Sequence, residues 1–216
     1  MDFSKFLQDF RDILPKVIID FKRVSPKQGD LFRGRKPVEV AKILESAGVL
    51  GLSVVTEPEH FGGSLDLLRD IVDAVNLPIL RKDFIKTEHD LHETIDCGAT
   101  EILLICSTIP FNDLPRLYEK SLELGLRPLV EVHNQTEMEL AVDLGADYVG
   151  INNKDITILE KDSGTVATTR ELISYAPKDA FIVSESGILT RDDADKALTA
   201  GADAVLIGTG FWRSNT

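Results

Sequence analysis

The strongest constraint on the fold is a repeated unit in which an amphipathic segment ends at a glycine and a short apolar run follows. Glycine suits the joint because the residue after a helix often takes a left-handed conformation that other residues adopt only with strain. The five copies predict helices 38–47, 88–97, 113–124, 135–144 and 190–200, ending at Gly48, Gly98, Gly125, Gly145 and Gly201, and strands 50–56, 101–105, 127–132, 148–151 and 204–207.

Two further units replace the glycine with a turn that contains proline. Helices 65–75 and 166–175 precede strands 79–82 and 181–185, and another strand begins near residue 17. Eight strands that alternate with helices predict a parallel sheet with right-handed crossovers. Eight such units favour a closed (β/α)8 barrel, the TIM barrel. The alternative is a doubly wound open sheet, although no GxGxxG motif follows any of the strands.

The two ends of the chain depart from a regular repeat. An amphipathic pattern over residues 3–14, ended by Pro15, predicts an extra N-terminal helix before the first strand. Only nine residues, 208–216, follow the last strand, which is too few for a full eighth helix. We expect the barrel to be open on that side or covered by the first helix. With no linker or low-complexity stretch, residues 1–216 are expected to form a single domain.

Charge and composition narrow the classes of partner. The chain has 36 acidic and 24 basic side chains, giving a net charge of −12. Such a surface repels nucleic acid and anionic membranes, so we expect neither as a partner. No signal peptide or run of about 20 apolar residues is present, which indicates a cytoplasmic protein.

Cysteine and histidine give no sign of a metal site. Cys97 and Cys106 lack metal-ligand spacing and are expected to be reduced, packed thiols. The four histidines, which are His60, His89, His92 and His133, do not cluster in the sequence, and we expect them to be solvated.

Charged and polar residues stand where the predicted strands end. Asp20 and Lys22 are two residues apart in the first strand, so their side chains point to the same face. In a (β/α)8 barrel the active site lies at the carboxyl ends of the strands. Each residue alone could be a surface lysine, a helix cap or a turn residue, but together they predict a site. The other candidates are Lys82, Phe84, Glu131, Asn152, Lys154, Glu185, Ser186, Gly187, Gly208 and Thr209.

Glycines after the last two strands indicate where a phosphate would bind. Gly187 follows the seventh strand, and the run 208–210 follows the eighth. These loops are a frequent phosphate site in such barrels because glycine lets backbone N–H groups approach the oxygens. Ordinary structural turns are the alternative. Lys22 or Lys154 would supply the positive charge that an acidic protein needs there.

The order of these motifs resembles the indole-3-glycerol phosphate synthase family over nearly the whole chain. The segments that carry the resemblance are IIDFKRVSPKQG, LSVVTEPEHFGGS, LPILRKDFI, RPLVEVH, VGINNKD, VSESGI and AVLIGTG. The resemblance implies a lyase without cofactor or metal. Its substrate would be 1-(2-carboxyphenylamino)-1-deoxyribulose 5-phosphate, converted to indole-3-glycerol phosphate in tryptophan biosynthesis.

The resemblance also implies roles for individual residues. Lys82 matches a general acid and Glu131 a general base, while Lys22 matches a lysine that binds substrate or itself serves as the acid. Asp20 stands at a position where the family usually has glutamate. Asn152 and Glu185 match positions that hydrogen-bond the substrate and the lysines. Among the substrate-binding positions, Ser25 matches a residue near the substrate carboxylate, and Phe84 and Phe61 match an aromatic wall. The phosphate end is matched by Ser186, Gly187, Gly208 and Thr209. Lys154 replaces an arginine that is usual in the family, and Lys27 replaces a usual serine.

Two other functions remain as alternatives. A phosphoribosylanthranilate isomerase would use an aspartate and a cysteine, and Cys106 lies at the wrong strand end for that role. A non-catalytic barrel would bind a sugar phosphate or a partner subunit without turnover. For the synthase we expect a monomer or weak oligomer, with association to other tryptophan-pathway enzymes as a further possibility.

Overall fold

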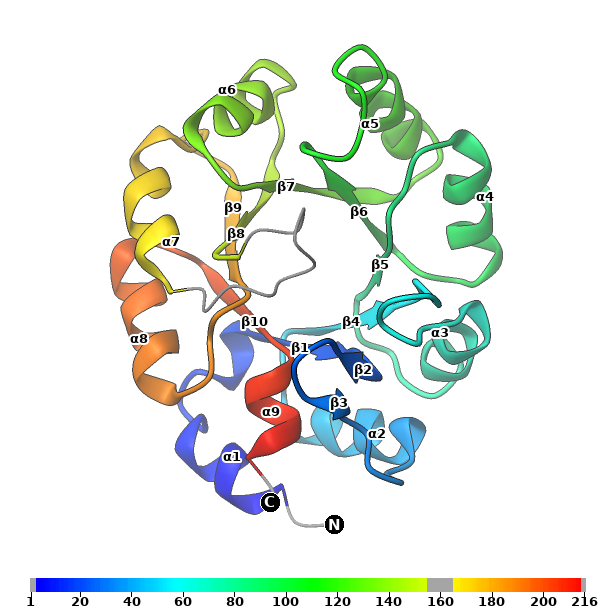
Figure 1. The fold of residues 1–216 in the computed structure, drawn as a ribbon, viewed down its shortest axis with the longest axis vertical. Helices are drawn as coiled ribbons and strands as arrows, with labels where there is room; N and C mark the ends of the chain where they lie inside the picture. The colour runs from blue at the N-terminus through cyan, green and yellow to red at the C-terminus, as the bar shows by residue number, and fades with distance from the viewer. Residues whose placement is uncertain (1–2, 155–164, 215–216) are drawn as a thin grey trace.

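Eight parallel strands close into a barrel in the computed structural model, which describes residues 3–154 and 165–214. The first and last strands pair with each other, Ile18 lying opposite Leu206, so the sheet has no free edge. The predicted (β/α)8 barrel is therefore confirmed (Figure 1). In sequence order the barrel strands are β1 (Val17–Phe21), β4 (Gly51–Val55), β5 (Ile79–Lys82), β6 (Glu101–Ile105), β7 (Arg127–Val132), β8 (Tyr148–Asn152), β9 (Phe181–Glu185) and β10 (Ala204–Ile207).

Helices surround the barrel, one after most strands (Figure 1). Several are fixed at their first turn by side chains, as in the capping boxes that Thr87 forms with Asp90 and Thr190 with Asp193. Within the described residues, the outer helices are α2 (Pro37–Ala47), α3 (Leu65–Val72), α4 (Glu88–Asp96), α5 (Leu114–Glu123), α6 (Gln135–Asp143), α7 (Ala167–Leu172), continued by the 3-10 turn η3 (Ile173–Tyr175), and α8 (Arg191–Ala200).

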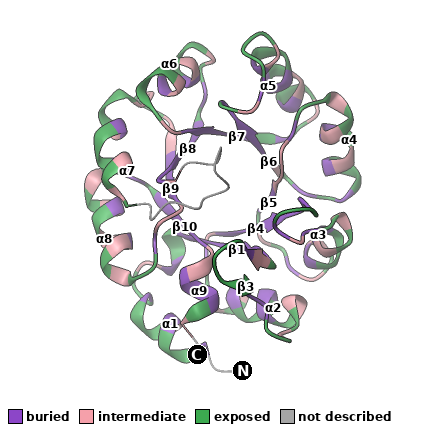
Figure 2. Cartoon of the chain, in the orientation of Figure 1, coloured by how far each residue is buried: buried purple, intermediate pink, exposed green. Residues whose placement is uncertain are grey.

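The core has an inner and an outer part. Figure 2 shows buried residues along the strands and exposed residues on the outward faces of the helices. Side chains that alternate along the strands fill the barrel, including Leu80, Leu103 and Leu129. The others pack under the helices, as Val130 and Val149 do. This filled interior leaves the carboxyl ends of the strands as the place for polar side chains.

The N-terminal segment covers the side of the barrel that lacks a full last helix. Helix α1 spans Ser4–Asp9, and a 3-10 turn, η1 (Leu14–Lys16), contains Pro15, so the predicted helix 3–14 was too long. After β10 the chain forms only α9 (Thr209–Arg213). The ring of Phe3 stacks on Phe211 with centroids 4.7 Å apart, and Phe6 meets the same ring edge-on at 5.0 Å. Figure 1 shows α1 and α9 side by side in the gap between α8 and α2.

A small hairpin after β1 was not predicted. It consists of β2 (Val24–Ser25) and β3 (Gly29–Asp30), which pair antiparallel. The backbone N–H of Val24 donates to the carbonyl of Phe61 at 2.9 Å, which joins the hairpin to the loop after β4. The hairpin therefore links two of the loops that surround the carboxyl end of the barrel.

Two other expectations can be compared with the structure. Cys97 and Cys106 are both buried and form no disulfide, as predicted. Among residues 3–154 and 165–214, the structure has no helix of the length and apolar character needed to span a membrane.

Candidate active site

Lys82, Glu131 and Glu185 meet at the carboxyl end of the barrel. Alternation along β5 directs Arg81 outward to α4 and Lys82 into the barrel mouth. The Lys82 ammonium lies 3.3 Å from Oε2 of Glu131 and also donates a hydrogen bond to Oε2 of Glu185. The predicted amine and acid, 49 residues apart in the sequence, are thus direct partners.

The position of Glu185 depends on a glycine in the neighbouring strand. Gly150 lies on β8, and a Cβ added there would overlap Oε1 of Glu185. Both Glu131 and Glu185 are at most 1% exposed. Only a residue without a side chain leaves room for this second carboxylate beside the first.

The two carboxylates have opposite shifts in pKa. Burial alone would raise the pKa of Glu131, but the charge of Lys82 and the contact with His133 outweigh burial and hold it below its usual range. Burial raises the pKa of Glu185; Lys82 opposes this shift, and the adjacent Glu131 adds to it. Glu131 therefore stays ionised at neutral pH, as a general base must.

His133 departs from the expectation that the histidines are solvated. Its side chain is only 14% exposed, and its Nε2 lies 3.3 Å from Oε1 of Glu131. Its Nδ1 lies 2.9 Å from Oε2 of Glu137. This contact was not predicted, although His133 follows Glu131 at a two-residue spacing that places both side chains on one face of an extended segment. That is the same signal that identified Asp20 and Lys22.

Asp20 and Lys22 lie across the barrel mouth from Glu131. Oδ1 of Asp20 accepts a hydrogen bond from the hydroxyl of Ser53 at 2.8 Å. The Lys22 ammonium lies 5.3 Å from the centroid of the Phe61 ring, within the range of a cation–π contact. These groups line the site on the side of β1 and β4.

An apolar pocket opens beside the Lys82 ammonium. Its aromatic walls are Phe61 and Phe84, and aliphatic side chains form its floor, so a flat ring would find apolar contact on several sides. Glu57 fixes the loop that carries Phe61, because its carboxylate accepts hydrogen bonds from the N–H groups of residues 59, 60 and 61. The lining residues are Lys22, Val55, Glu57, Phe61, Lys82, Asp83, Phe84, Leu103, Ile105 and Glu131.

A second, more polar pocket adjoins the first and shares two lysines with it. Ser186 and Gly187 both have positive φ, at 64° and 70°, so the loop after β9 turns sharply at this pocket. The side-chain amide of Asn153 holds that loop by donating to the carbonyls of Glu185 and Ser186 at 2.9 and 3.1 Å. The lining residues are Asp20, Lys22, Lys82, Lys154, Ser186, Gly187, Ile188, Leu189, Leu206, Gly208 and Thr209.

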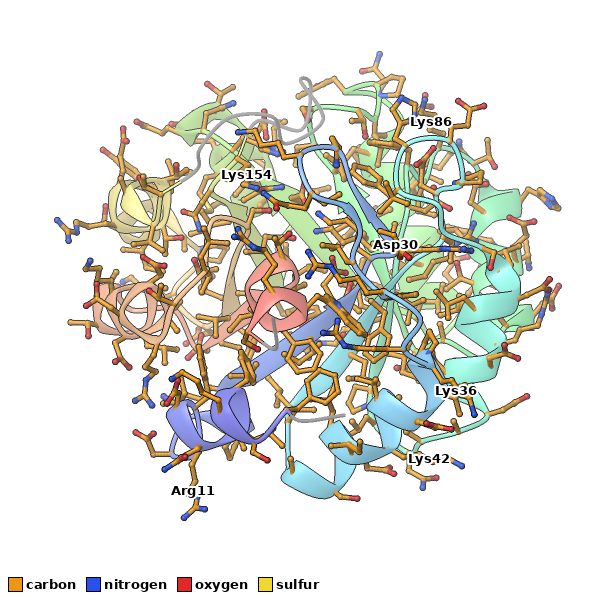
Figure 3. All side chains as sticks on the ribbon, turned by 60° about the horizontal axis from the view of Figure 1, so that its bottom comes forward. Arg11, Asp30, Lys36, Lys42, Lys86 and Lys154 are labelled. Atoms are coloured by element: carbon orange, nitrogen blue, oxygen red, sulfur yellow. The ribbon has the colours of Figure 1, made fainter. Side chains whose placement is uncertain are left out.

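The positive charge of this pocket comes from lysines at the carboxyl end of the barrel. Figure 3 shows Lys154, after β8, and Lys86, after β5, toward the same end of the barrel, with Arg11 toward the other. Three lysines line a pocket in a chain whose net charge is −12. Local positive charge and glycine-bearing loops are what a phosphate group requires.

Two predicted site residues, Asn152 and Ser25, are buried but do not line either pocket. Asn152 is buried, and its Oδ1 accepts from the N–H of Lys154 at 2.9 Å. Its Nδ2 and Oε1 of Glu185 have no hydrogen-bond partner within the described part of the chain. Such atoms are usually satisfied by a ligand or water. Ser25, which is buried in β2, lines neither of the two pockets.

One group of side chains has the spacing of a metal site. Donor atoms of Glu57, Glu59 and His60 lie within 4.8 Å of one another. Both carboxylate oxygens of Glu57 already accept backbone N–H groups of the same loop, so its charge is used to fix the loop. This arrangement does not fit a dedicated metal site.

Comparison with known proteins assigns the family. The family model described as indole-3-glycerol phosphate synthase matches residues 1–216. The chain belongs to the indole-3-glycerol phosphate synthase family. Members of this family are carboxy-lyases of tryptophan biosynthesis that close a ring with loss of carbon dioxide, and the chain is such an enzyme, acting on a small phosphate-bearing molecule.

Individual relatives agree with the family model. The indole-3-glycerol phosphate synthase of Thermococcus kodakarensis is 41% identical over 198 residues, which are 92% of this chain and 86% of the relative. That of Clostridium acetobutylicum is 36% identical over 211 residues, covering 96% and 79% of the two chains. Among solved structures, the N-acetylmannosamine-6-phosphate 2-epimerase of Clostridium perfringens aligns with a TM-score of 0.71 at 17% identity, over 95% of this chain and 91% of the other. The last likeness concerns the fold alone.

Proposed function

We propose that this synthase closes the ring of 1-(2-carboxyphenylamino)-1-deoxyribulose 5-phosphate with Lys82 as general acid and Glu131 as general base. The observation that carries the proposal is the contact of Lys82 with Glu131 at the junction of an apolar and a cationic pocket. The aromatic ring would occupy the pocket of Phe61 and Phe84. The phosphate would bind at the loops of Gly187 and Gly208.

The chemistry requires an acid and a base at one junction. The ring carbon that bears the carboxylate attacks the ketone carbon while Lys82 protonates the ketone oxygen. Carbon dioxide then leaves, and its bonding electrons restore the aromatic ring. Lys82 is reprotonated and then donates a proton to the new hydroxyl, which leaves as water. Glu131 takes the proton that is lost from the ring, and this loss completes the double bond of the five-membered ring. Holding the two flexible ends in adjoining pockets brings the reacting carbons together.

The roles of the two lysines are separable. Lys82 lines both pockets and contacts two carboxylates at their junction, which places its ammonium where the ring and the phosphate-bearing chain would meet, as the acid requires. Lys22 lines both pockets and lies over the Phe61 ring, which suits binding of the substrate carboxylate. Asn152 and Glu185 would orient the substrate hydroxyls and Lys82, while Asp20 and Lys154 would border the phosphate side.

Turnover of the purified protein tests the proposal. We expect the carboxyphenylamino substrate to give a product with indole fluorescence without any added metal or cofactor. Lys82→Met and Glu131→Gln should each lower kcat by roughly 10²–10⁴-fold, the usual range for a positioned acid or base. Lys86→Met, an exposed lysine at the same end of the barrel, is the matched control and should retain the parent rate.

The outcomes of this experiment distinguish the alternatives. Parent-like kcat in either variant would show that its role is misassigned. Loss of activity in Lys22→Met with full activity in Lys82→Met would transfer the acid to Lys22. A folded parent protein without turnover would favour the non-catalytic barrel.

We also propose that residues 1–216 form a single domain and work in the cytoplasm as a monomer or weak oligomer, with transient contacts to other enzymes of the pathway. Exposed large apolar side chains such as Phe111, Leu122 and Val142 are spread over different elements of the described chain. Because stable interfaces usually need a contiguous apolar patch, we expect self-association to be weak at most. Light scattering on a sizing column should give a mass near that of one 23.9 kDa chain. A stable dimer at micromolar concentration would contradict this expectation.

A further inference from the structure

We propose that His133, held by Glu137, is a positioning residue for the reaction that fixes the carboxylate of Glu131 and keeps it ionised. This inference rests on the proposed role of Glu131 as the base. Acidic and basic side chains alternate along one row, Glu137, His133, Glu131, Lys82 and Glu185, with each neighbouring pair in contact.

The outer end of this row is rigid. Glu137 lies in the first turn of α6, and its Oε2 accepts hydrogen bonds from the backbone N–H of His133 at 2.9 Å as well as contacting the ring. Its Oε1 accepts from the side-chain amide of Asn134 at 2.7 Å, and Asn134 also caps the helix. The imidazole therefore has a fixed orientation, because its anchor is part of a helix start.

The inner end of the row determines how Glu131 faces the substrate. His133 contacts Oε1 of Glu131, and Lys82 contacts Oε2, so each oxygen has one cationic partner. Oε1 of Glu131 and Nε2 of His133 make no hydrogen bond among the described residues, so the two atoms are joined as an ion pair at 3.3 Å. Removing His133 would thus leave one buried oxygen of Glu131 without its cation and let the carboxylate rotate away from the substrate.

The balance of charge supports a cationic His133. Without the charge of His133, Glu131 would share its contact with the Lys82 ammonium with Glu185, and its other oxygen would face no cation among the described residues. The titratable groups around Glu131 are His133, Lys82 from β5, Cys106 immediately after β6 and Glu185 from β9, with Glu137 of α6 on the far side of His133.

The protonation of His133 follows from its two carboxylates. Burial lowers the pKa of His133, but its contacts with Glu131 and Glu137 outweigh burial and raise the pKa to about 10. Because this folded-state pKa lies above the unfolded value of about 6.5, the imidazolium contributes stability that is complete below about pH 6.5. That stability is lost as pH rises toward 10.

Substitution of each member of the row tests the proposal. His133→Gln keeps a hydrogen-bond donor but removes the charge, and Glu137→Gln removes the anchor. We expect each to lower kcat by about 10²-fold, the effect of a misplaced catalytic group, with little change in KM. The acid limb of the kcat profile should move to higher pH because Glu131 loses a cationic neighbour. The double variant should be no worse than the more severe single one, because both changes disrupt one unit.

The control and the contrary outcomes are specific. His92→Gln changes an exposed histidine of α4 and should leave kcat and its pH profile unchanged. If His133→Gln lowers the melting temperature but leaves kcat and the acid limb unaltered, the histidine only ties β7 to α6 and the proposal is wrong.

A measurement independent of turnover separates this inference from the proposed function. In NMR titration of the imidazole nitrogens, His133 should remain protonated well above the pH at which exposed histidines titrate, about 6.5. Titration of His133 near that value would overturn the inference even in an active enzyme. An inactive parent protein with a protonated His133 would instead contradict the role assigned to Glu131.

Discussion

At the scale of single residues, the site depends as much on a missing side chain as on those that are present. Gly150 leaves the space that Oε1 of Glu185 occupies. The carboxylate in that space accepts a hydrogen bond from the Lys82 ammonium, so the glycine acts on the proposed acid through one intermediate group. Its role could not be predicted from the sequence, because the order of residues does not show the register of β8 against β9 that sets Gly150 beside the Glu185 side chain.

Substitution of this glycine should therefore impair catalysis more than folding. Gly150→Ala would push Glu185 out of its position and weaken its bond to Lys82. We expect kcat to fall by roughly 10²-fold, the effect of a displacement of about 1 Å at the reacting groups. Steady-state kinetics and thermal unfolding measure the two effects separately. Gly125→Ala, at a helix end where an added Cβ meets no other atom within 4 Å, is the matched control for stability alone. A parent-like kcat in Gly150→Ala would show that Glu185 tolerates displacement.

At the scale of elements, two adjacent strand ends are joined by one buried amide. Asn153, after β8, donates to the hydroxyl of Ser184 at 3.0 Å and to two carbonyls of the β9 end. Its Oδ1 accepts from the backbone N–H and the hydroxyl of Thr169 at 3.1 and 3.0 Å. The loop that carries Ser186 and Gly187 is thus tied to both β8 and α7.

Removal of this amide should weaken substrate binding. In Asn153→Ala the carbonyls of Glu185 and Ser186 lose a donor, so the loop of Ser186 and Gly187, the proposed phosphate site, loosens and KM should rise severalfold. Stability should fall by about 1–3 kcal/mol, the cost of leaving buried polar groups unsatisfied. Ser64→Ala, which removes the cap of α3, should cost about 1 kcal/mol without changing KM. An unchanged KM in Asn153→Ala would show that the loop holds its shape without the amide.

The elements were largely predictable because local chemistry specifies them. Strands 101–105, 127–132 and 181–185 were predicted with the bounds observed, since each apolar run lies between a turn and a polar residue. The hairpin of β2 and β3 was missed because two-residue strands carry no periodicity. The helix over 3–14 was too long because the aromatic spacing continues past Asp9 although the backbone turns there. Most proposed site residues were found from strand ends, whereas the contact of His133 with Glu137 depends on how α6 packs against the end of β7.

At the scale of the whole molecule, aromatic packing closes the barrel where no full last helix is present. Phe3 and Phe6 pack on Phe211, and the indole N–H of Trp212 donates to the carbonyl of Asp20 at 2.7 Å. A bidentate pair between Arg191 and Asp12 adds a second link from the N-terminal segment to α8. The N-terminal segment is therefore a structural part of the barrel wall.

Truncation of one of these rings should destabilise the fold without changing the chemistry. Phe6 is buried, and Phe6→Ala should cost about 3–5 kcal/mol, which lowers the melting temperature by roughly 10 °C for a chain of this size. Circular dichroism during heating measures the shift, and kcat at 25 °C should remain at the parent value. Phe111→Ala is the matched control, because that ring is 68% exposed. A small shift in Phe6→Ala would mean that the N-terminal segment packs only loosely.

The stacking of Phe3 on Phe211 also places the beginning and the end of the described chain against each other. Because β1 and β10 are hydrogen-bonded neighbours as well, the order of elements around the barrel is cyclic. The two ends of the described chain meet at one position on this circle, between α8 and α2 (Figure 1). A chain that started and finished at a different outer turn, with the present ends joined by a short linker, would keep every strand pairing and the proposed site at the carboxyl ends of the strands.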